Sequence, residues 1–145
     1  MIRLSKLADY AFVILTQMVS RHDAPWAAGE LATRTALPGP TVAKILKMLA
    51  RGNVVVATRG ATGGYRLKLA AEDISVIAIV EAVDGPVALT ACVVSDDPDC
   101  AARNFCPMHQ GWDKINRAMR GALTDVTLAD LVADVAAPLP RKAAP

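Results

Sequence analysis

Apolar residues recur with helical spacing along most of this sequence, with one short strand-like interruption. The first such stretch covers residues 5–20 and predicts an amphipathic helix with Ser5 as its N-cap. Its inward positions are Leu7, Ala11, Ile14, Leu15 and Met18. Residues 27–35 predict a short second helix. Trp26, just before it, is expected in the core, because large aromatic side chains mostly serve burial.

The next stretch, residues 37–69, combines a helix with a hairpin. The helix begins near Pro38 and Pro40, since a proline in the first turn loses only an amide without a partner, and it ends at Gly52-Asn53. Its buried side is formed by Val42, Ile45, Leu46 and Leu49. Residues 54–59 and 65–69 are β-prone and are joined by a glycine-rich run, which predicts a hairpin. This order is the pattern of a winged helix-turn-helix.

Helical spacing returns after the hairpin. A helix is expected from about residue 72 until Asp84-Gly85-Pro86 ends it, and periodicity is then lost up to about Pro107. A long helix from Met108 to Thr124 and a short one from Leu128 to Val135 follow. The long helix carries a narrow apolar stripe, typical of helices that pair, formed by Trp112, Ile115, Met119, Ala122 and Val126. We predict a dimerisation helix, with a helix folded back on its own domain as the alternative.

Charge is divided unevenly along the chain, although the net charge is only +2. Residues 34–68 contain seven Lys or Arg and no Asp or Glu, whereas residues 70–102 contain seven Asp or Glu and no Lys or Arg. On the third helix, Lys44, Lys47 and Arg51 fall opposite the apolar side. Such residues often only solvate an outer face. A cationic helix followed by a wing, with no acid over the whole span, favours DNA binding instead.

A DNA-binding function assigns roles to these side chains. The third helix would enter the major groove, with Thr41, Lys44 and Lys47 near base edges and Arg51 near phosphate. In the hairpin, Arg59 would lie beside the minor groove or the backbone, and Arg66 would add positive charge. The glycine-rich run is not a phosphate-binding loop, because no Lys-Ser/Thr follows it and it joins two strands.

The expected fold class is mainly α with a small β-hairpin. It comprises a winged helix-turn-helix DNA-binding domain (residues 1–85), a cysteine-containing loop (86–107), dimerisation helices (108–135) and a disordered tail (136–145). No apolar run approaches the roughly 20 residues of a membrane span, and the N-terminus lacks the features of a secretory signal. The odd number of cysteines, three, fits a reducing compartment. A cytoplasmic protein without membrane association is therefore expected.

All three cysteines lie in the aperiodic segment, as Cys92-x7-Cys100-x5-Cys106-x2-His109. Three thiolates and one imidazole, from a loop and a helix start, can enclose a metal centre. Buried structural cysteines are the alternative, although an acid-rich loop is a poor place for core residues. Zinc sites usually bring C-x2-C pairs, which this segment lacks. The wide spacings suit an iron–sulfur cluster better, but spacing alone does not decide between the metals.

With these residues placed, the chain resembles the winged-helix regulators typified by the iron–sulfur cluster regulator IscR and the nitric-oxide sensor NsrR. The likeness covers nearly all of residues 2–135 and is most specific in RLSKLADYA, LPGPTVAKILKMLARGNVV, RGATGGYRL, ISVIAIVEAVDGPVALTAC and CPMHQGWDKINRAMRGAL. Within this family the chain looks most like regulators of the SUF iron–sulfur assembly system. The resemblance implies a homodimer crossed by the long helix, a palindromic operator in double-stranded DNA, and a cluster held by Cys92, Cys100 and Cys106.

The resemblance implies two candidates for a fourth ligand. In IscR-like members a histidine at the place of His109 completes a [2Fe-2S] cluster, whereas in NsrR-like members Asp9 of the partner subunit would complete a [4Fe-4S] cluster. We favour His109 and [2Fe-2S], because His109 is local. The predicted function is a transcriptional repressor of iron–sulfur assembly genes that senses cluster or redox status. A nitric-oxide or thiol-redox sensor, a regulator with structural zinc and, in a different class, an iron–sulfur electron carrier are the alternatives. No catalytic constellation accompanies the cysteines, so an enzyme is not expected.

Overall fold

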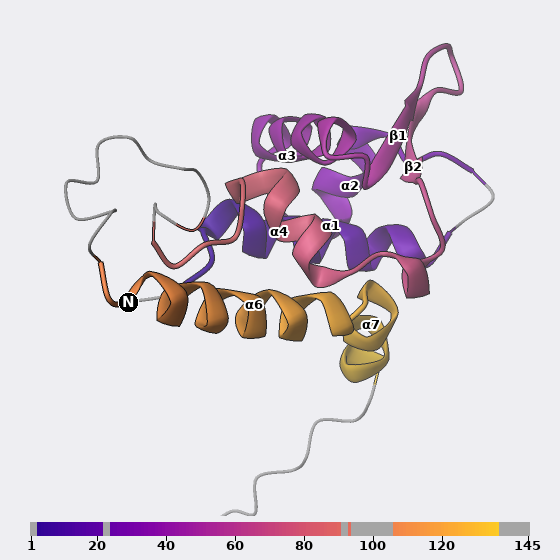
Figure 1. The fold of residues 1–145 in the computed structure, drawn as a ribbon. Coiled ribbons are helices and arrows are strands. Elements are labelled where there is room, and N and C mark those ends of the chain that lie inside the picture. Colours follow the sequence, from indigo (N-terminus) through magenta and orange to yellow (C-terminus); the bar gives the residue numbers. More distant parts are fainter. Residues whose placement is uncertain (1–2, 22–23, 91–92, 94–105, 137–145) are drawn as a thin grey trace, which may run out of the picture.

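The computed structural model describes residues 3–21, 24–90, 93 and 106–136 and is drawn in Figure 1. Its elements are α1 (Lys6–Val19), α2 (Ala28–Thr35), α3 (Gly39–Arg51), β1 (Val55–Thr58), β2 (Gly64–Leu67), the 3-10 helix η1 (Ala71–Asp73), α4 (Val76–Asp84), α6 (His109–Asp125) and α7 (Leu128–Ala136). The predicted mainly helical fold with one hairpin is confirmed. Of the predicted loop and tail, residues 91–92, 94–105 and 137–145 lie outside the described residues. In the described ranges no helix is long and apolar enough to cross a bilayer.

Helix α1 lies at the centre and packs against α2, α3, α4 and α7. Of its predicted inward residues, Ala11, Ile14, Leu15 and Met18 are buried, and Leu7 is half-buried against the core. Ala8, which was not predicted, is buried as well. Ser5 accepts a hydrogen bond from the Ala8 N–H at 3.1 Å, which confirms the predicted N-cap. Leu31 of α2, the apolar side of α3 and Ile79 of α4 complete the same core. The burial of each large apolar side chain contributes roughly 1.5–3 kcal/mol, so the core holds the helices in fixed relative positions.

The fourth helix begins later than predicted. Residues 71–73 form a separate 3-10 turn, and α4 begins at Val76. The reason lies at Ile74 and Ser75, which are extended, with ψ of 104° and 151°. The extended backbone lets Ser75 accept from the Ala78 N–H at 3.4 Å as an N-cap. It also leaves the Ile74 carbonyl free to accept from the N–H of Leu128 at 2.8 Å.

Helix α4 packs against both α3 and α6, and Figure 1 shows it between them. The approach to α3 is close: a Cβ added at Gly52 would lie 2.3 Å from the Cβ of Ala82. Glycine is therefore required where α3 ends against α4. Asn53 follows with a left-handed φ of 60°, which confirms the predicted stop at Gly52-Asn53. Any displacement of α4 thus bears directly on the C-terminal end of α3.

The chain after α6 returns to the central core. Leu128 is fully buried, and α7 packs against α1 and η1. Thr127 caps α7: its N–H and its hydroxyl both donate to Asp130 at 2.8 Å, and the Asp130 N–H donates back to the hydroxyl at 3.2 Å. The hydrogen bonds from the Thr127 N–H and hydroxyl lower the pKa of Asp130. The far end of α6 is therefore fixed to the same core as α3.

Candidate nucleic-acid interface and cysteine segment

The cationic side of α3 is exposed. Its apolar side is fully buried through Val42, Ile45, Leu46 and Leu49. Lys44, Lys47 and Arg51 lie opposite and are all exposed, and Thr41 is half-exposed at the start of the helix. Within the part of the chain that the structure describes, no ion pair or side-chain hydrogen bond engages the three cations. Their charge is therefore available to a polyanion.

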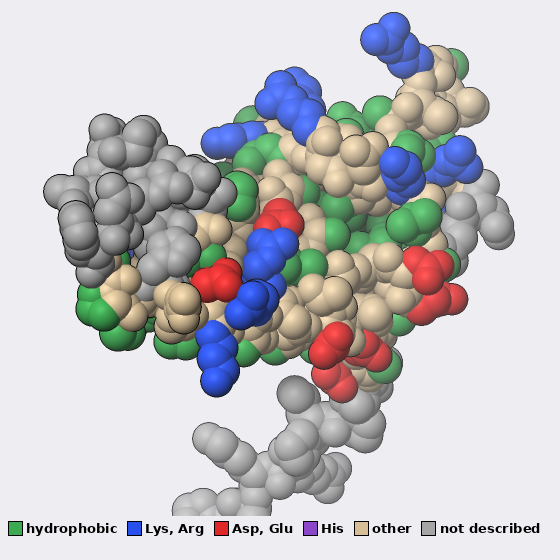
Figure 2. Space-filling view, viewed as in Figure 1, with side chains coloured by type: hydrophobic (Ala, Val, Ile, Leu, Met, Phe, Trp, Pro, Cys, Tyr) green, Lys and Arg blue, Asp and Glu red, His purple; other side chains and the backbone are tan. Residues whose placement is uncertain are grey.

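Figure 2 shows that charge is separated on the folded molecule as well as along the sequence. Lys and Arg side chains gather over α3 and the hairpin, acidic side chains gather over η1 and α7, and side chains of both signs lie over α4 and α6. The acidic side is exposed and includes Glu72, Asp73, Asp130 and Asp134. One side of the described protein therefore attracts phosphate and another repels it.

A tight turn joins α2 to α3 and completes the predicted helix-turn-helix. Ala36 ends α2 in the left-handed region, with a φ of 55°. Leu37 is half-buried and packs against the core. Pro38 then precedes α3, with Pro40 in its first turn, where the missing N–H costs nothing. This turn presents the N-terminal half of α3 to solvent.

The predicted hairpin is present as the antiparallel pair β1 and β2, with Val55 opposite Leu67 and Thr58 opposite Gly64. Arg59 enters the exposed loop directly after β1. Arg66 lies on β2 and is exposed, whereas its neighbours Tyr65 and Leu67 are half-buried. Both predicted arginines of the hairpin are thus on its surface, and Figure 1 shows the hairpin projecting beyond the helices.

Trp26 connects the hairpin to the helices. Its side chain is 2% exposed, so the predicted core position is confirmed. Its backbone also pairs with Tyr65: the Trp26 N–H donates to the Tyr65 carbonyl at 2.7 Å, and the Tyr65 N–H donates back at 2.9 Å. A Cβ at Gly64 would lie 2.4 Å from the Trp26 carbonyl oxygen, so only glycine permits this approach. The angle of the wing is therefore set by the segment before α2.

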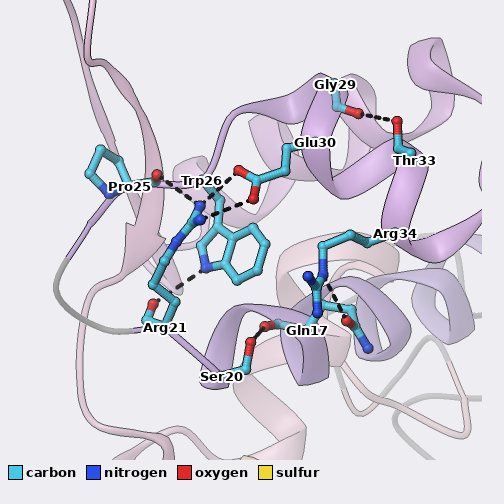
Figure 3. A network of polar contacts seen from close by, with 9 residues as sticks. All are labelled: Gln17, Ser20, Arg21, Pro25, Trp26, Gly29, Glu30, Thr33 and Arg34. Carbon is cyan, nitrogen blue, oxygen red and sulfur yellow. Dashed lines mark hydrogen bonds and ion pairs between the residues drawn. The ribbon is translucent and has the colours of Figure 1, made fainter.

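An arginine cluster around Trp26, drawn in Figure 3, fixes that segment. The Arg21 guanidinium lies 3.8 Å from the centre of the Trp26 ring and donates to both carboxylate oxygens of Glu30, at 2.9 and 2.8 Å. It also donates to the Pro25 carbonyl at 3.2 Å. The hydrogen bond from Arg21 lowers the pKa of Glu30. The cluster joins the end of α1 to the first turn of α2. No local sequence pattern marks this cluster, because its members lie in two elements and an intervening turn.

Two of the seven Lys and Arg residues of positions 34–68 make side-chain contacts within the fold. Arg34 donates to Gln17 at 3.3 Å and lies 5.4 Å from the centre of the Trp26 ring. The Lys68 ammonium donates to the Asn53 side chain at 2.9 Å. The five that remain, Lys44, Lys47, Arg51, Arg59 and Arg66, are the basic residues predicted to contact DNA.

Of the predicted metal ligands, the structure describes Cys106, Asp9 and the backbone of His109. Cys106 is half-buried immediately before α6, and His109 is the first residue of that helix, although its side chain is outside the described residues. Cys92 and Cys100 also lie outside them. Asp9 is exposed in the first turn of α1. No cluster of His, Cys, Asp or Glu able to hold a metal occurs among the described residues. The predicted donor set, three cysteine thiols and one histidine imidazole, is chemically suited to an iron–sulfur centre.

A polar junction links the chain that leads to the cysteines with α4 and α6. Glu81 of α4 accepts hydrogen bonds from Arg120 of α6 and from the Val87 N–H, the latter at 3.1 Å. Arg120 also donates to the Val87 carbonyl at 3.3 Å. Partial burial opposes ionisation of Glu81, but the hydrogen bonds from Arg120 and Val87 outweigh it and lower the pKa of Glu81. This junction was not predicted from the sequence.

The lowered pKa of Glu81 predicts a stability difference in acid. Its carboxylate stabilises the fold above its ordinary pKa of 4.5, and the contribution is lost as the pH falls through the lowered folded value. Glu81→Gln should therefore be less stable than the wild type near neutral pH, and the difference should shrink as the pH falls below 4.5. Urea denaturation at stepped pH measures this. Glu72→Gln, at an exposed site on η1, should follow the wild-type profile; a constant gap for Glu81→Gln would contradict the prediction.

The helix-turn-helix, the wing and the cationic surface define a winged-helix DNA-binding protein. The chain belongs to the Rrf2 family, described as iron-dependent transcriptional regulators, whose family model matches residues 4–134. The predicted family and the predicted absence of enzymatic function are thereby confirmed, because the family consists of transcriptional regulators.

Two curated relatives agree with this placement, and two solved structures share the fold. The HTH-type regulator IscR of Photobacterium profundum is 28% identical over 133 residues, covering 91% of this chain and 76% of its own. An rrf2-like regulator of Rhodobacter capsulatus is 30% identical over 132 residues, covering 86% and 88%. Among structures, CymR, the global cysteine regulator of B. subtilis, has a TM-score of 0.69 at 24% identity and covers 92% of this chain and 98% of its own. IscR of T. potens has a TM-score of 0.66 at 22% identity, covering 92% and 88%. Both structures share the fold.

Proposed function

We propose that the protein is a homodimeric repressor of iron–sulfur cluster assembly genes that binds a palindromic operator and senses cluster status through a [2Fe-2S] centre. The observation that carries the DNA-binding part is the exposed side of α3, where Lys44, Lys47 and Arg51 have no acidic partner among the described residues. The iron-dependent family supports the sensing part. A regulator of the SUF assembly system remains the most specific form of this proposal.

On DNA, α3 lies in the major groove. Thr41, Lys44 and Lys47, in its first turns, face base edges, and Arg51 at its end contacts phosphate. The hairpin then reaches the flanking backbone or minor groove through Arg59, while Arg66 adds charge on β2. The pairing of Trp26 with Tyr65 holds the hairpin at a fixed angle to α3, so both contacts are made together.

The cluster ligands in this proposal are Cys92, Cys100, Cys106 and His109, with Asp9 of the partner subunit as the alternative fourth ligand. Such a cluster, when bound, supplies thiolate-ligated iron with a reduction potential that responds to charge and solvent exposure. Cys106 is adjacent to α6, so a change in its ligation acts on the first turn of that helix. Arg120, further along α6, bonds Glu81 of α4, whose neighbour Ala82 contacts Gly52 at the end of α3. These contacts connect α6, which begins three residues after Cys106, to the DNA-binding helix.

Anaerobic purification tests the cofactor. The wild type should be coloured and contain iron and acid-labile sulfide in equal amounts, two of each per chain for [2Fe-2S]. His109→Ala should lose most of the iron, whereas Asp9→Ala should retain it. The reverse pattern would assign the fourth ligand to Asp9. A colourless protein with stoichiometric zinc would overturn the iron–sulfur proposal and leave a DNA-binding protein with structural metal.

The dimer in this proposal is supported by the outer side of α6. The predicted apolar stripe divides in the structure: Trp112 and Met119 are half-buried on the side facing the domain, whereas Ile115 and Val126 are 46% and 38% exposed. Met108, which is 50% exposed, lies in the same outward-facing row as Ile115 and Val126. Ala122 is exposed in the same row. Apolar side chains in a row on a helix surface favour a second helix over solvent.

Substituting Ile115 tests this dimer. Ile115→Asp places a charge in the middle of the row and should convert the dimer to a monomer at micromolar concentration, because an unpaired charge is costly to bury. Analytical ultracentrifugation measures the mass. Lys114→Asp, on the neighbouring exposed position of the same helix, is the matched control and should remain dimeric. A monomeric wild type, or a dimeric Ile115→Asp, would contradict the proposed interface.

A further inference from the structure

We propose that α3 identifies its half-site through guanines contacted by Lys44 and Lys47 and a thymine methyl group contacted by Ala43. This inference rests on the proposed DNA-binding function and names the base chemistry that the function requires. It follows from which side chains α3 exposes, and from the hydrogen-bonding groups that α3 lacks.

The orientation of α3 limits the residues that can reach a base. The four apolar positions that are fully buried fix one side of the helix against the core. At 100° per residue, the side directly opposite carries Pro40, Lys44, Lys47 and Arg51, and all four are exposed. Thr41 and Ala43 flank this row and are half-exposed. A recognition helix contacts bases with its N-terminal residues, whereas Arg51 lies in the last turn of α3. The exposed and half-exposed residues that remain for base contacts are Pro40, Thr41, Ala43, Lys44 and Lys47.

The hydrogen-bonding groups of these residues are almost entirely donors. Helix α3, GPTVAKILKMLAR, contains no Asn, Gln, Asp or Glu, so it has no side-chain amide for adenine and no carboxylate for the cytosine amino group. The Thr41 hydroxyl is its one side-chain oxygen acceptor. A lysine ammonium has three donors and no acceptor. Lys44 and Lys47 can therefore only donate hydrogen bonds, and they need acceptor atoms on the edge of a base.

Guanine offers the best target for such a group. It presents N7 and O6 side by side in the major groove, whereas adenine places an amino donor beside its N7, and thymine presents one oxygen next to a methyl group. Lys44 and Lys47 are three residues apart, about 4.5 Å along the helix axis, which is close to the roughly 3.4 Å rise between base pairs. Two guanines within two base pairs of each other are thus in reach. Ala43 lies beside Lys47 on the next turn, and its methyl group matches that of thymine.

Selection from a random-core duplex library gives the first test, with protein purified anaerobically and with the same protein treated with chelator. At least one of the two forms should enrich half-sites with two guanines within two base pairs and an adjacent thymine. In the selected duplex, 7-deazaguanine in place of either guanine removes N7 and should weaken binding about tenfold. Deoxyuridine in place of the thymine removes one methyl group and should weaken it about fourfold.

Variants of α3 give the second test. Lys44→Gln supplies an amide that pairs with adenine, so the preference at one position should move from guanine towards adenine. Arg51→Gln is the matched control: it should weaken binding to all sequences without changing the preferred base. Sequence-specific binding that is indifferent to 7-deazaguanine, or unchanged preference in Lys44→Gln, would overturn this inference while leaving the DNA-binding function intact. Binding to no duplex in either form would overturn both.

Discussion

Replacing Lys44 and Lys47 together by alanine is expected to lower the affinity for the operator about a hundredfold or more at physiological salt. Both ammonium groups are exposed and have no partner among the described residues, so each is free to contact the duplex. Removing two cations from the helix that lies in the groove should also make the slope of log affinity against log salt less steep. Fluorescence anisotropy with a labelled operator over a salt series measures both quantities.

The matched control removes the same charge elsewhere. Lys114→Ala combined with Arg117→Ala neutralises two exposed cations of α6 and should keep the affinity within about threefold, because these positions lie away from α3. The α3 double variant should keep the unfolding midpoint of the wild type, since neither lysine is buried. If its affinity and salt slope match those of the wild type, a surface other than α3 binds the DNA.

Trp26→Ala is expected to cost about 3–5 kcal/mol of folding free energy, out of the roughly 5–15 kcal/mol that a typical domain possesses. Its side chain is 2% exposed, so the substitution leaves a large cavity. The ring is also the platform for the Arg21 guanidinium, 3.8 Å from its centre. We expect a lower urea midpoint, faster proteolysis in the hairpin loop after Arg59, and weaker operator binding. Equilibrium denaturation and limited trypsin digestion measure the first two effects.

Trp26→Phe separates packing from the polar role of the indole. It keeps an aromatic ring and the backbone pairing with Tyr65 but loses the hydrogen bond from the indole N–H to the Arg21 carbonyl, which measures 3.3 Å. A loss of about 1–2 kcal/mol is expected, with the hairpin still protected from trypsin. If Trp26→Ala were as stable as the wild type, the Trp26 ring would not support the wing.

The helices and the hairpin could be predicted because their signals are local. The apolar side of α3, the Ser5 cap and the stop at Gly52-Asn53 are each specified by residues a few positions apart. The late start of α4 could not, because its cause is a hydrogen bond between Ile74 and Leu128, distant in sequence. Likewise, the stripe on α6 predicted an apolar surface but not its division between the domain side and the outer side, which depends on how α6 packs against α4.

The same distinction holds for the candidate site. The basic residues of α3 and the hairpin were found from charge and periodicity, and the structure places their side chains at the surface. The contacts that hold them in position were not found. Arg21 with Glu30, and Glu81 with Arg120, are pairs of ordinary charged residues that no motif marks, and only the fold brings them together. For the ligand set, Cys92 and Cys100 lie outside the described residues, so those assignments stay predictions.

The opposed charges of the α3–hairpin side and the η1–α7 side give the protein a permanent electric dipole. The electric field of a DNA duplex exerts a torque on this dipole and turns the basic side of the protein towards the phosphates before the two molecules touch. Collisions in the wrong orientation are thereby made rarer, and arrival at DNA is faster than a uniformly charged molecule of the same net charge would achieve. Salt should slow that arrival as well as weaken the complex, because the orienting field fades within about 8–10 Å at cellular ionic strength.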